Sequence, residues 1–320
     1  MAYSVLAYYL LVPISDPEKV LLEHKIFFQN CDVRSRVYIS TQGINAQVSI
    51  LNRDLDEYLH WLHKMYAIPL SEVKIHTTEE HAFPRKVVKI RRELVAMNLN
   101  VPLDQQEGIY LSPSQWKEKL NNMHNKGDIL LLDVRNNYET RVGYFMGATT
   151  PNLCSFREFI SYGKRLLHRV NPKKTEIMMY CTGGIRCAFY ARFLKQLGFD
   201  LLFQLKGGII QYGLEEGSCH WRGKLFVFDD RMVIPISAEE VEIFSSCCFC
   251  LEKSDIYYNC ANMDCNRLFI SCLHCIQEFR GCCSKRCLDG GRVRCFSEKA
   301  KPFRKLLHEE KKVLSFHQKK

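Results

Sequence analysis

The pattern of apolar and polar positions divides the first hundred residues into short strands and two helices. Strands are predicted where apolar residues alternate with polar ones, and helices where they recur every three or four positions. Asp16 before Pro17 marks a helix start, because aspartate caps a free N–H group and proline suits the first turn. The predicted elements are strands over 4–13, 36–40, 45–50, 73–76 and 87–95, a helix opening at 16 and a helix over 52–66.

The order of these elements, β-α-β-β-α-β, is typical of an α+β domain of the ferredoxin-like or acylphosphatase-like kind, which we place at residues 1–100. Its last predicted strand carries a run of five cations: Arg85, Lys86, Lys89, Arg91 and Arg92. Val88 and Ile90 alternate with these cations, so one face of the strand is expected to be buried and the other charged. The charged face is either simply solvated or a track for the phosphates of a folded RNA.

A second domain is predicted over residues 111–235, after a linker at 101–110 that contains proline and glycine. Helices alternate here with apolar runs that predict buried parallel strands: the strands are 129–135, 177–180 and 201–205, and one helix is 155–170. This alternation predicts an α/β domain with a mainly parallel sheet. Functional sites in such sheets lie at the carboxyl ends of the strands.

The segment after the run 177–180 carries a reactive cysteine at such a strand end. Its residues are Cys181, Thr182, Gly183, Gly184, Ile185, Arg186 and Cys187. A cysteine at a strand-to-helix turn meets free backbone N–H groups and the positive end of a helix, and both favour the thiolate. Two glycines let these amides converge, and arginine adds a permanent cation. We therefore predict that Cys181 is a nucleophile held by this loop, and not an ordinary buried cysteine.

The number of residues between Cys181 and Arg186 narrows the range of reactions expected of the loop. Cysteine phosphatases place five residues between cysteine and arginine, whereas four separate Cys181 from Arg186. The shorter loop resembles that of rhodaneses, which carries a persulfide on its cysteine. Cys187 either resolves an oxidised or persulfidated Cys181 as a disulfide or packs as a small residue beneath the loop, and packing is the preferred interpretation.

Three charged residues follow another predicted strand end. Asp133, Arg135 and Glu139 match the Asp-x-Arg-x-x-x-Glu segment of rhodanese domains. They either take part in the chemistry or form an ion-pair network that orders the loops. We prefer the second interpretation, so these residues are predicted to support the site.

Residues 236–300 contain eleven of the chain's sixteen cysteines. Eight of these form four closely spaced pairs, which are Cys247 and Cys250, Cys260 and Cys265, Cys272 and Cys275, and Cys283 and Cys287. Such spacing lets thiolates share tetrahedral zinc, so two structural zinc ions are predicted. Cys248 and Cys282 adjoin these pairs and are alternative ligands, and iron–sulfur ligation is less favoured.

Composition and charge predict the kind of partner and the cellular compartment of the protein. The formal charge of +10 points to an anionic partner such as nucleic acid, although zinc-bound thiolates would offset part of it. A basic tail, 301–320, is interpreted as solvated. No apolar stretch approaches the roughly 20 residues needed to span a bilayer, so no membrane partner is expected. Clustered cysteines favour metal binding in a reducing compartment, and we expect a cytoplasmic protein.

Together the three segments resemble the bacterial rhodanese-domain proteins described as tRNA uridine-34 hydroxylases. The resemblance covers nearly the whole chain and rests on six motifs: Gln42-Gly43-Ile44-Asn45, Asp133-Val134-Arg135-Asn136, the Cys181–Cys187 loop, Phe226-Val227-Phe228-Asp229-Asp230-Arg231, Asn259-Cys260-Ala261-Asn262 and Cys265-Asn266-Arg267-Leu268-Phe269. It implies oxygen-dependent formation of 5-hydroxyuridine at the wobble position of tRNA, with molecular oxygen as co-substrate. Cys181 would be the catalytic cysteine, proposed in this family to carry a persulfide.

One residue departs from the family pattern. Many members have Glu directly after the second cysteine of the loop, where this chain has Ala188, so that role is vacant or supplied by another residue. The residues alone leave two alternatives open: a rhodanese-type persulfide sulfurtransferase and a non-catalytic RNA-binding or redox-sensing protein. A separate protein that donates electrons or sulfur is a further expected partner.

Overall fold

The computed structural model of the chain describes residues 2–98, 103, 107–123, 128–238 and 241–296. The predicted basic tail, 301–320, and half of the predicted linker, 101–110, lie outside these residues. The described chain divides into two units. Residues up to 222, together with 236–239, belong to the first, and residues 223–235 and those from 240 onward belong to the second.

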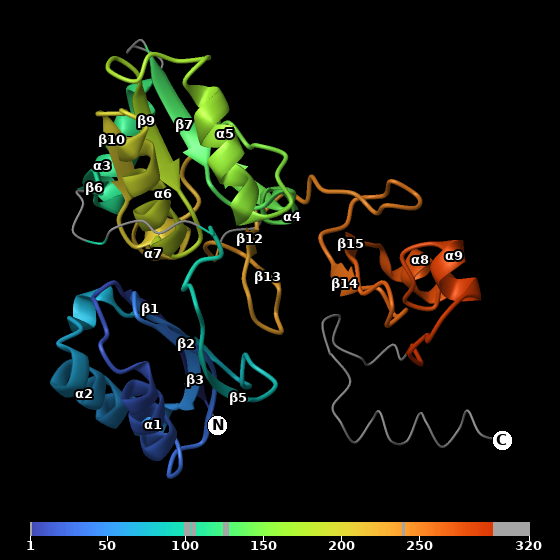
Figure 1. Cartoon of the computed structure of the whole chain (residues 1–320). Coiled ribbons are helices and arrows are strands. Elements are labelled where there is room, and N and C mark those ends of the chain that lie inside the picture. The colour runs from blue at the N-terminus through green and yellow to red at the C-terminus, as the bar shows by residue number, and fades with distance from the viewer. Residues whose placement is uncertain (1, 99–102, 104–106, 124–127, 239–240, 297–320) are drawn as a thin grey trace. The chain divides into compact units, whose positions relative to one another are not determined.

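The first hundred residues form a five-stranded sheet in the order β4-β1-β3-β2-β5 (Figure 1). Its elements are β1 (Tyr3–Leu10), α1 (Pro17–Phe27), β2 (Val33–Ser40), β3 (Gly43–Leu51), α2 (Leu55–Tyr66), β4 (Lys74–Thr78) and β5 (Lys86–Ile90). The first four strands of that order pair antiparallel, and β5 adds in parallel to β2. The predicted ferredoxin-like fold is confirmed.

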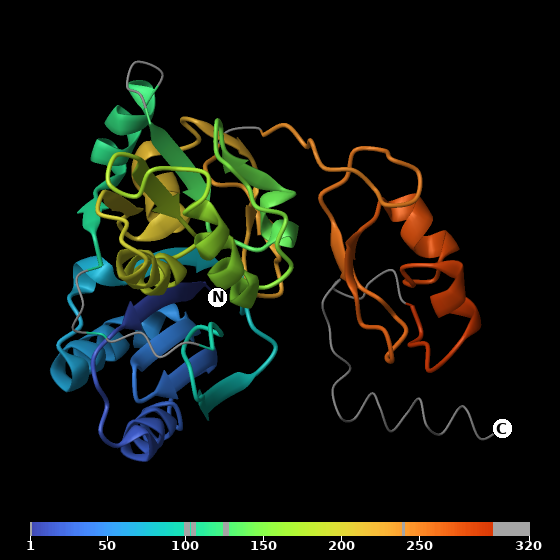
Figure 2. The same ribbon diagram turned by 45° about the horizontal axis from the view of Figure 1, so that its top comes forward.

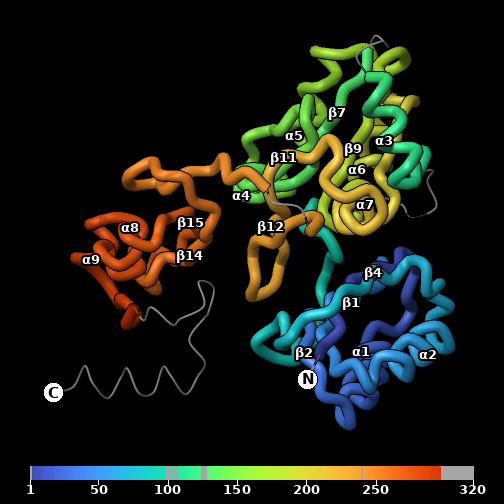
Figure 3. Tube along the Cα trace, turned by 180° about the vertical axis from the view of Figure 1, so that it is seen from behind, coloured from blue at the N-terminus to red at the C-terminus, as the bar shows by residue number. Residues whose placement is uncertain are grey.

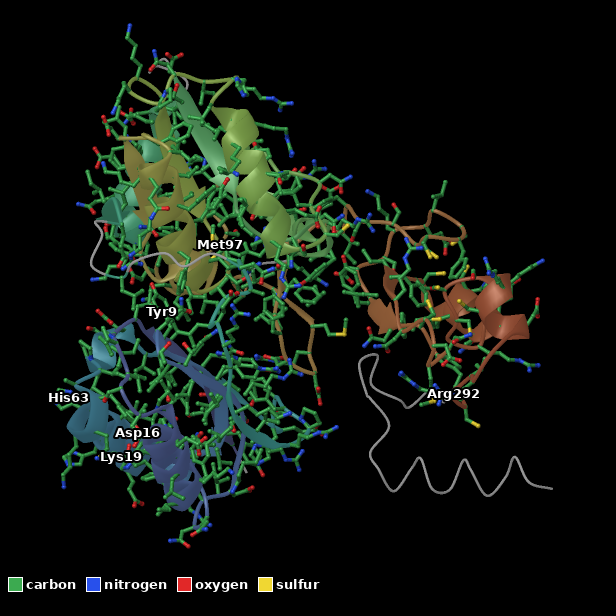
Figure 4. The ribbon with its side chains drawn as sticks, viewed as in Figure 1. Tyr9, Asp16, Lys19, His63, Met97 and Arg292 are labelled. Carbon is green, nitrogen blue, oxygen red and sulfur yellow. The ribbon has the colours of Figure 1, made fainter. Side chains whose placement is uncertain are left out.

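Both helices of this domain lie side by side on one face of the sheet (Figures 1 and 3). The Asp16 side chain accepts a hydrogen bond from the Lys19 N–H at 2.9 Å, which confirms the predicted helix start (Figure 4). Phe27 of α1 meets Trp61 of α2 with ring centroids 4.8 Å apart. Apolar contact between the helices thus closes the core against the sheet.

A tight turn explains the glycine of the motif at residues 42–45. Gly43 has φ +135°, and a Cβ there would lie 1.9 Å from the carbonyl oxygen of Leu10. Only glycine lets β3 begin this close to the end of β1. Tyr9 pairs in register with Asn45, so the motif lies beside the carboxyl end of β1.

The next domain has a parallel sheet in the order β6-β10-β9-β7, as predicted for an α/β domain. Its elements are β6 (Ile109–Leu111), α3 (Pro113–Asn121), β7 (Ile129–Asp133), α4 (Asn137–Thr140), β8 (Gly143–Phe145), α5 (Phe159–Leu166), β9 (Glu176–Tyr180), α6 (Ile185–Gln196), β10 (Leu202–Leu205), α7 (Gly208–Glu216) and β11 (Trp221–Gly223). Helices α5 and α6 contact each other, as do α3 and α7 (Figures 1 and 3). Helices therefore cover both faces of the sheet.

The described part of the second unit contains two hairpins and two short helices. They are β12 (Leu225–Phe226) with β13 (Val233–Ile234), β14 (Tyr257–Asn259) with β15 (Leu268–Ile270), α8 (Leu273–Glu278) and α9 (Lys285–Asp289). Figure 2 shows the β14–β15 hairpin beside the two helices, in orange to red. The predicted limits of the domains stay predictions. None of the helices in the described residues has the length and apolar character that crossing a membrane requires.

Several predicted elements are shorter in the structure, and two of them differ most from the prediction. The strand predicted over 87–95 ends at Ile90, because Leu94 and Val95 leave the sheet and enter the core of the α/β domain. The helix predicted over 155–170 begins with a 3-10 turn and is α-helical only over Phe159–Leu166. Packing against another domain decides where the strand predicted over 87–95 ends. Local periodicity does not report such packing.

Candidate active site

The Cys181 sulfur lies at the bottom of the loop that joins β9 to α6. Cys181 is 1% exposed, and the N–H of Gly184 donates to its Sγ at 3.1 Å. Gly184 has φ +101°, a conformation that residues with a Cβ rarely adopt. The strand end and the helix start therefore converge on the sulfur as the sequence predicts.

Several neighbours stabilise the anionic form of this sulfur. Burial by itself would raise the pKa of Cys181. Hydrogen bonds from the Cys187 thiol and from backbone amides, together with the Arg186 guanidinium, outweigh burial and lower that pKa to about 5. Burial and the adjacent Cys181 charge raise the pKa of Cys187 well above its usual range, so it remains a thiol. At neutral pH the loop thus holds one thiolate and one hydrogen-bond-donating thiol.

Arg186 is fixed by a buried carboxylate. Its guanidinium donates to both oxygens of Glu139, at 2.5 and 2.7 Å, and Thr182 donates to the same carboxylate at 3.3 Å. Glu139 is fully buried and also accepts from the N–H of Asn136 at 3.1 Å. One carboxylate therefore ties α4 to the cysteine loop.

A second buried ion pair lies at the end of β7. Arg135 donates to both oxygens of Asp133, with a closest distance of 2.6 Å, and to the carbonyl of Gly143 at 2.6 Å. Both side chains are inaccessible to solvent, and the guanidinium lies 5.2 Å from the Trp221 ring centroid. These contacts are those expected of residues that order the loops, and their supporting role stays a prediction.

A second loop, which sequence reasoning missed, holds the cysteine loop from the other side. The N–H groups of Ile209 and Ile210, at the start of α7, donate to the carbonyls of Cys181 and Thr182 at 3.0 and 3.1 Å. Gly208 makes this approach possible, because a Cβ there would lie 2.6 Å from the Cys181 carbonyl oxygen. The adjacent glycines 207 and 208 were the available signal in the sequence.

The first domain also reaches this loop. A Cβ on Gly184 would lie 3.1 Å from the Tyr9 hydroxyl, so Tyr9 covers the loop at its glycine. Gln42 accepts from the N–H of Leu94 at 3.3 Å, and Met97 enters the core of the α/β domain (Figure 4). Nothing in the local sequence of Tyr9 indicated this contact, because it joins residues far apart along the chain.

At Ala188, where the family pattern has glutamate, the structure has a fully buried methyl group in α6. Its carbonyl accepts from Arg192 at 3.1 Å, and Arg192 forms an ion pair with Glu107. A carboxylate from another part of the chain is thus present near this position. Whether it takes the role of the missing glutamate stays a prediction.

The five cations of the predicted RNA face are all exposed, along β5 and just before and after it. Lys86 donates to the Phe28 carbonyl, and Arg91 lies 5.1 Å from the ring centroid of Tyr38. The expected buried position of Ile90 is wrong, because its side chain lies at the end of the edge strand β5 and is 39% exposed. RNA binding by this face stays a prediction.

The structure brings the eight paired cysteines into two groups of four. Cys247, Cys250, Cys272 and Cys275 form one group, and Cys260, Cys265, Cys283 and Cys287 form the other. The Sγ atoms within each group lie within 4.8 Å of one another, and the closest pairs are 3.6 to 3.8 Å apart. A tetrahedral zinc with bonds of about 2.3 Å separates its ligands by about 3.8 Å, so both groups fit such an ion.

Each group combines two pairs that are not adjacent in the sequence. The first pair of each group lies before β15 and the second lies after it, so the two sites interlock around the β14–β15 hairpin. Figure 4 shows sulfur atoms, in yellow, gathered between this hairpin and the helices α8 and α9. Cys248 and Cys282 belong to neither group.

Fold and site together define the class of protein: a rhodanese-type protein with an activated loop cysteine, preceded by an acylphosphatase-like domain. Three family models match along the chain. They are the UPF0176 acylphosphatase like domain at residues 3–94, the Rhodanese-like domain at 117–214 and Rhodanase C-terminal at 222–288.

Relatives that match over nearly their whole length give the family. A tRNA uridine(34) hydroxylase of Protochlamydia amoebophila is 47% identical over 319 residues, which cover 99% of this chain and 98% of that protein. The protein of the same name from Chlamydia trachomatis serovar D is 46% identical over 95% of this chain and 92% of its own. The chain belongs to the tRNA uridine(34) hydroxylase family.

Solved structures resemble only part of the chain. A rhodanese-related protein from Thermoplasma volcanium covers 34% of this chain and 93% of its own, at 20% identity and a TM-score of 0.27. The rhodanese-like domain of an Anabaena protein covers 44% of this chain and 93% of its own, at 19% identity and a TM-score of 0.30. Neither adds to the assignment made from the full-length relatives.

Proposed function

We propose that this protein hydroxylates uridine 34 of tRNA to 5-hydroxyuridine, with Cys181 as the reactive group. The observation that carries the proposal is the match over nearly the full chain to tRNA uridine(34) hydroxylases. The thiolate-stabilising loop around Cys181 supports it, because it supplies an activated group at the carboxyl end of a parallel strand.

The proposed reaction is that of an oxidoreductase that uses molecular oxygen. One oxygen atom replaces hydrogen at C5 of the uracil as a hydroxyl, and the other leaves as water. This balance consumes two protons and two electrons, so it requires a two-electron donor, which we place in a separate donor protein. Cys181 takes part as the thiolate or as a persulfide, in which the outer sulfur is held by the same amides.

The tRNA is proposed to contact the exposed cations Arg85, Lys86, Lys89, Arg91 and Arg92. Their charges suit the phosphates of a folded RNA, which dominate the affinity of most nucleic-acid complexes. The abundance of free thiols fits a reducing compartment, and we propose the cytoplasm as the place of action.

Two structural zinc ions are proposed for the cysteine groups of the second unit. All eight ligands are thiolates, which close the coordination sphere and leave no position for substrate. Zinc has no redox chemistry, so its contribution is to folding, and the oxygen chemistry is proposed for the Cys181 site.

The proposal is tested by nucleoside analysis of tRNA from cells that lack this protein. Loss of 5-hydroxyuridine is expected, with recovery by the wild-type chain and no recovery by Cys181→Ala. A Cys31→Ala chain is the matched control, because that cysteine lies in the first domain outside the loop, and it should restore the nucleoside fully.

The two alternative functions predict different nucleosides. If 5-hydroxyuridine is unchanged and 2-thiouridine is lost, the function is sulfur transfer to RNA and not hydroxylation. If no nucleoside changes, the remaining hypothesis is a non-catalytic protein that binds RNA or senses oxidants. Full recovery of 5-hydroxyuridine by Cys181→Ala would remove Cys181 from the mechanism.

A further inference from the structure

Lys74 is a buried cation that the known motifs do not include. It begins β4, an edge strand of the first domain, and is only 7% exposed. Among the residues that the structure describes, none forms a salt bridge with it. Its Nζ lies 5.3 Å from the centroid of the Tyr9 ring. A lysine is seldom buried without a charged partner, so its surroundings must stabilise its charge in another way.

The position of Lys74 relative to the active-site loop suggests which group pairs with its charge. A Cβ on Gly207 would lie 3.4 Å from the Cε of Lys74, so the lysine touches the turn before α7. Directly after this turn, at the start of α7, the N–H of Ile209 donates a hydrogen bond to the Cys181 carbonyl. Tyr9, over which the ammonium lies, covers the same loop at Gly184. Lys74 thus approaches the loop between two elements that contact it.

We propose that Lys74 is a positioning residue for the reaction: its ammonium, supplied by the acylphosphatase-like domain, faces the Cys181 sulfur and stabilises it as an anion. The site is then complete only when the first domain is packed on the rhodanese-like domain. The catalytic meaning of this role rests on the proposed function, but the electrostatic contact itself does not.

The charges around Cys181 show how a second cation adds to its stabilisation. The positive charge of Arg186 is already matched by Glu139, with which it shares two hydrogen bonds. The pair as a whole is close to neutral, so it compensates the thiolate charge only in part, beside the hydrogen bonds from Cys187 and the backbone amides. In a buried site an uncompensated charge is costly, and an unpaired ammonium nearby offsets that cost. Lys74 supplies this ammonium.

The ionisable groups that act on Cys181, or on the groups around it, come from several elements. They are Tyr9, Lys74, Glu107, Tyr110, Asp133, Glu139, Arg186, Cys187 and Lys206. Burial lowers the pKa of Lys74 to about 8, although the negative charges of Glu72 and Cys181 act to raise it. Lys74 is therefore still a cation at pH 7 and loses its charge as the pH rises through 8.

The test is the pH dependence of Cys181 alkylation by iodoacetamide in the reduced, zinc-loaded full-length chain, followed by mass spectrometry of the Cys181 peptide. Two inflections are expected for the wild type, one near pH 5 for Cys181 and one near pH 8 for Lys74. Lys74→Met should raise the lower midpoint by about one pH unit and abolish the upper inflection.

Two further variants separate charge from shape. Lys74→Arg keeps the cation but does not titrate, so it should keep the low midpoint and lose only the upper inflection. Lys64→Met, at an exposed lysine of α2 in the same domain, is the matched control and should match the wild type in both inflections. Circular dichroism establishes that each variant is folded.

An unchanged lower midpoint in folded Lys74→Met would overturn the proposal. If that variant does not fold, the wild type alone decides, because a profile without the upper inflection contradicts the titration of Lys74 beside the thiolate. Since alkylation uses neither tRNA nor oxygen, this result is independent of hydroxylation. Cells carrying Lys74→Met should contain less 5-hydroxyuridine, and unchanged 5-hydroxyuridine would show that the contact has no catalytic role.

Discussion

Cys181 is a buried acid whose ionised state is favoured by its neighbours. Hydrogen bonds from the Cys187 thiol and backbone amides, together with Arg186, overcome the cost of burying a charge. Their effect on the pKa is also an effect on stability, because the thiol has a higher pKa in the unfolded chain. The residue that is proposed to react therefore also contributes a pH-dependent part of the folding free energy.

The direction of the Cys181 pKa shift determines how its contribution to the folding free energy changes with pH. The pKa of Cys181 falls from about 9 in the unfolded chain to about 5 in the folded one, so its stabilisation is complete above pH 9 and is lost as the pH falls to 5. The stability advantage of the wild type over Cys181→Ser should therefore grow by up to about 1.4 kcal/mol per pH unit between pH 5 and 9. Urea unfolding of both chains at pH 6 and pH 8, under reducing conditions, measures this difference. Equal differences at the two pH values would contradict a thiolate in the folded state.

At the scale of elements, two turns form the site together. The turn before α6 carries Cys181, and the turn before α7 holds the carbonyls of that loop with its first N–H groups. Gly208 has φ +70° where the two turns meet, whereas the space around Gly183 is open, and a Cβ added there would meet no atom within 4 Å. Glycine is thus required for packing in one turn but not at every position of the other.

These two glycines give a matched pair of substitutions. Gly208→Ala forces a methyl group against the Cys181 carbonyl and a positive φ on alanine, which should lower the free energy of unfolding by about 2–4 kcal/mol. Gly183→Ala should cost less than about 1 kcal/mol. Thermal unfolding measures both, and Cys181 alkylation should slow only in Gly208→Ala. Equal effects of the two substitutions would show that the second turn does not hold the loop.

At the scale of the whole molecule, the chain is divided between a unit that contains Cys181 and a unit that contains the cysteine groups. Among its described residues, the second unit has short strands and helices and a small buried core. We expect a segment of this kind to depend on metal for its stability, because a small apolar core alone does not offset the entropy of ordering the chain.

Metal removal should therefore affect the two units differently. Elemental analysis is expected to find about two zinc per chain, by the ligand count. A strong chelator should make residues 241–296 exchange amide hydrogens rapidly, while the sheets and helices of the first unit stay protected. The alkylation profile of Cys181 should not change, since its stabilising groups belong to the first unit. A fully protected second unit without metal would contradict a structural role for zinc.

Local patterns predicted much of the fold. The helix start at Asp16 and the parallel strand before Cys181 follow from capping and periodicity, which depend on neighbours in the sequence. The eight paired cysteines were recognisable because ligand spacing is a local property. The predictions that failed depended on distant contacts: Leu94 and Val95 leave their strand for another domain's core, and Ile90 lies at an exposed strand edge.

The sequence by itself determined the nucleophile candidate, the order of the domains and the family, because a short loop and a full-length match carry that information. The tertiary structure alone decided which pairs of cysteines share a group, that Glu139 holds Arg186, and that Tyr9, Lys74 and the turn before α7 reach the cysteine loop. The physical reason is distance along the chain. Groups within the loop stabilise the buried thiolate, but the groups that hold and cover this loop lie far from it along the chain, and only folding brings them together.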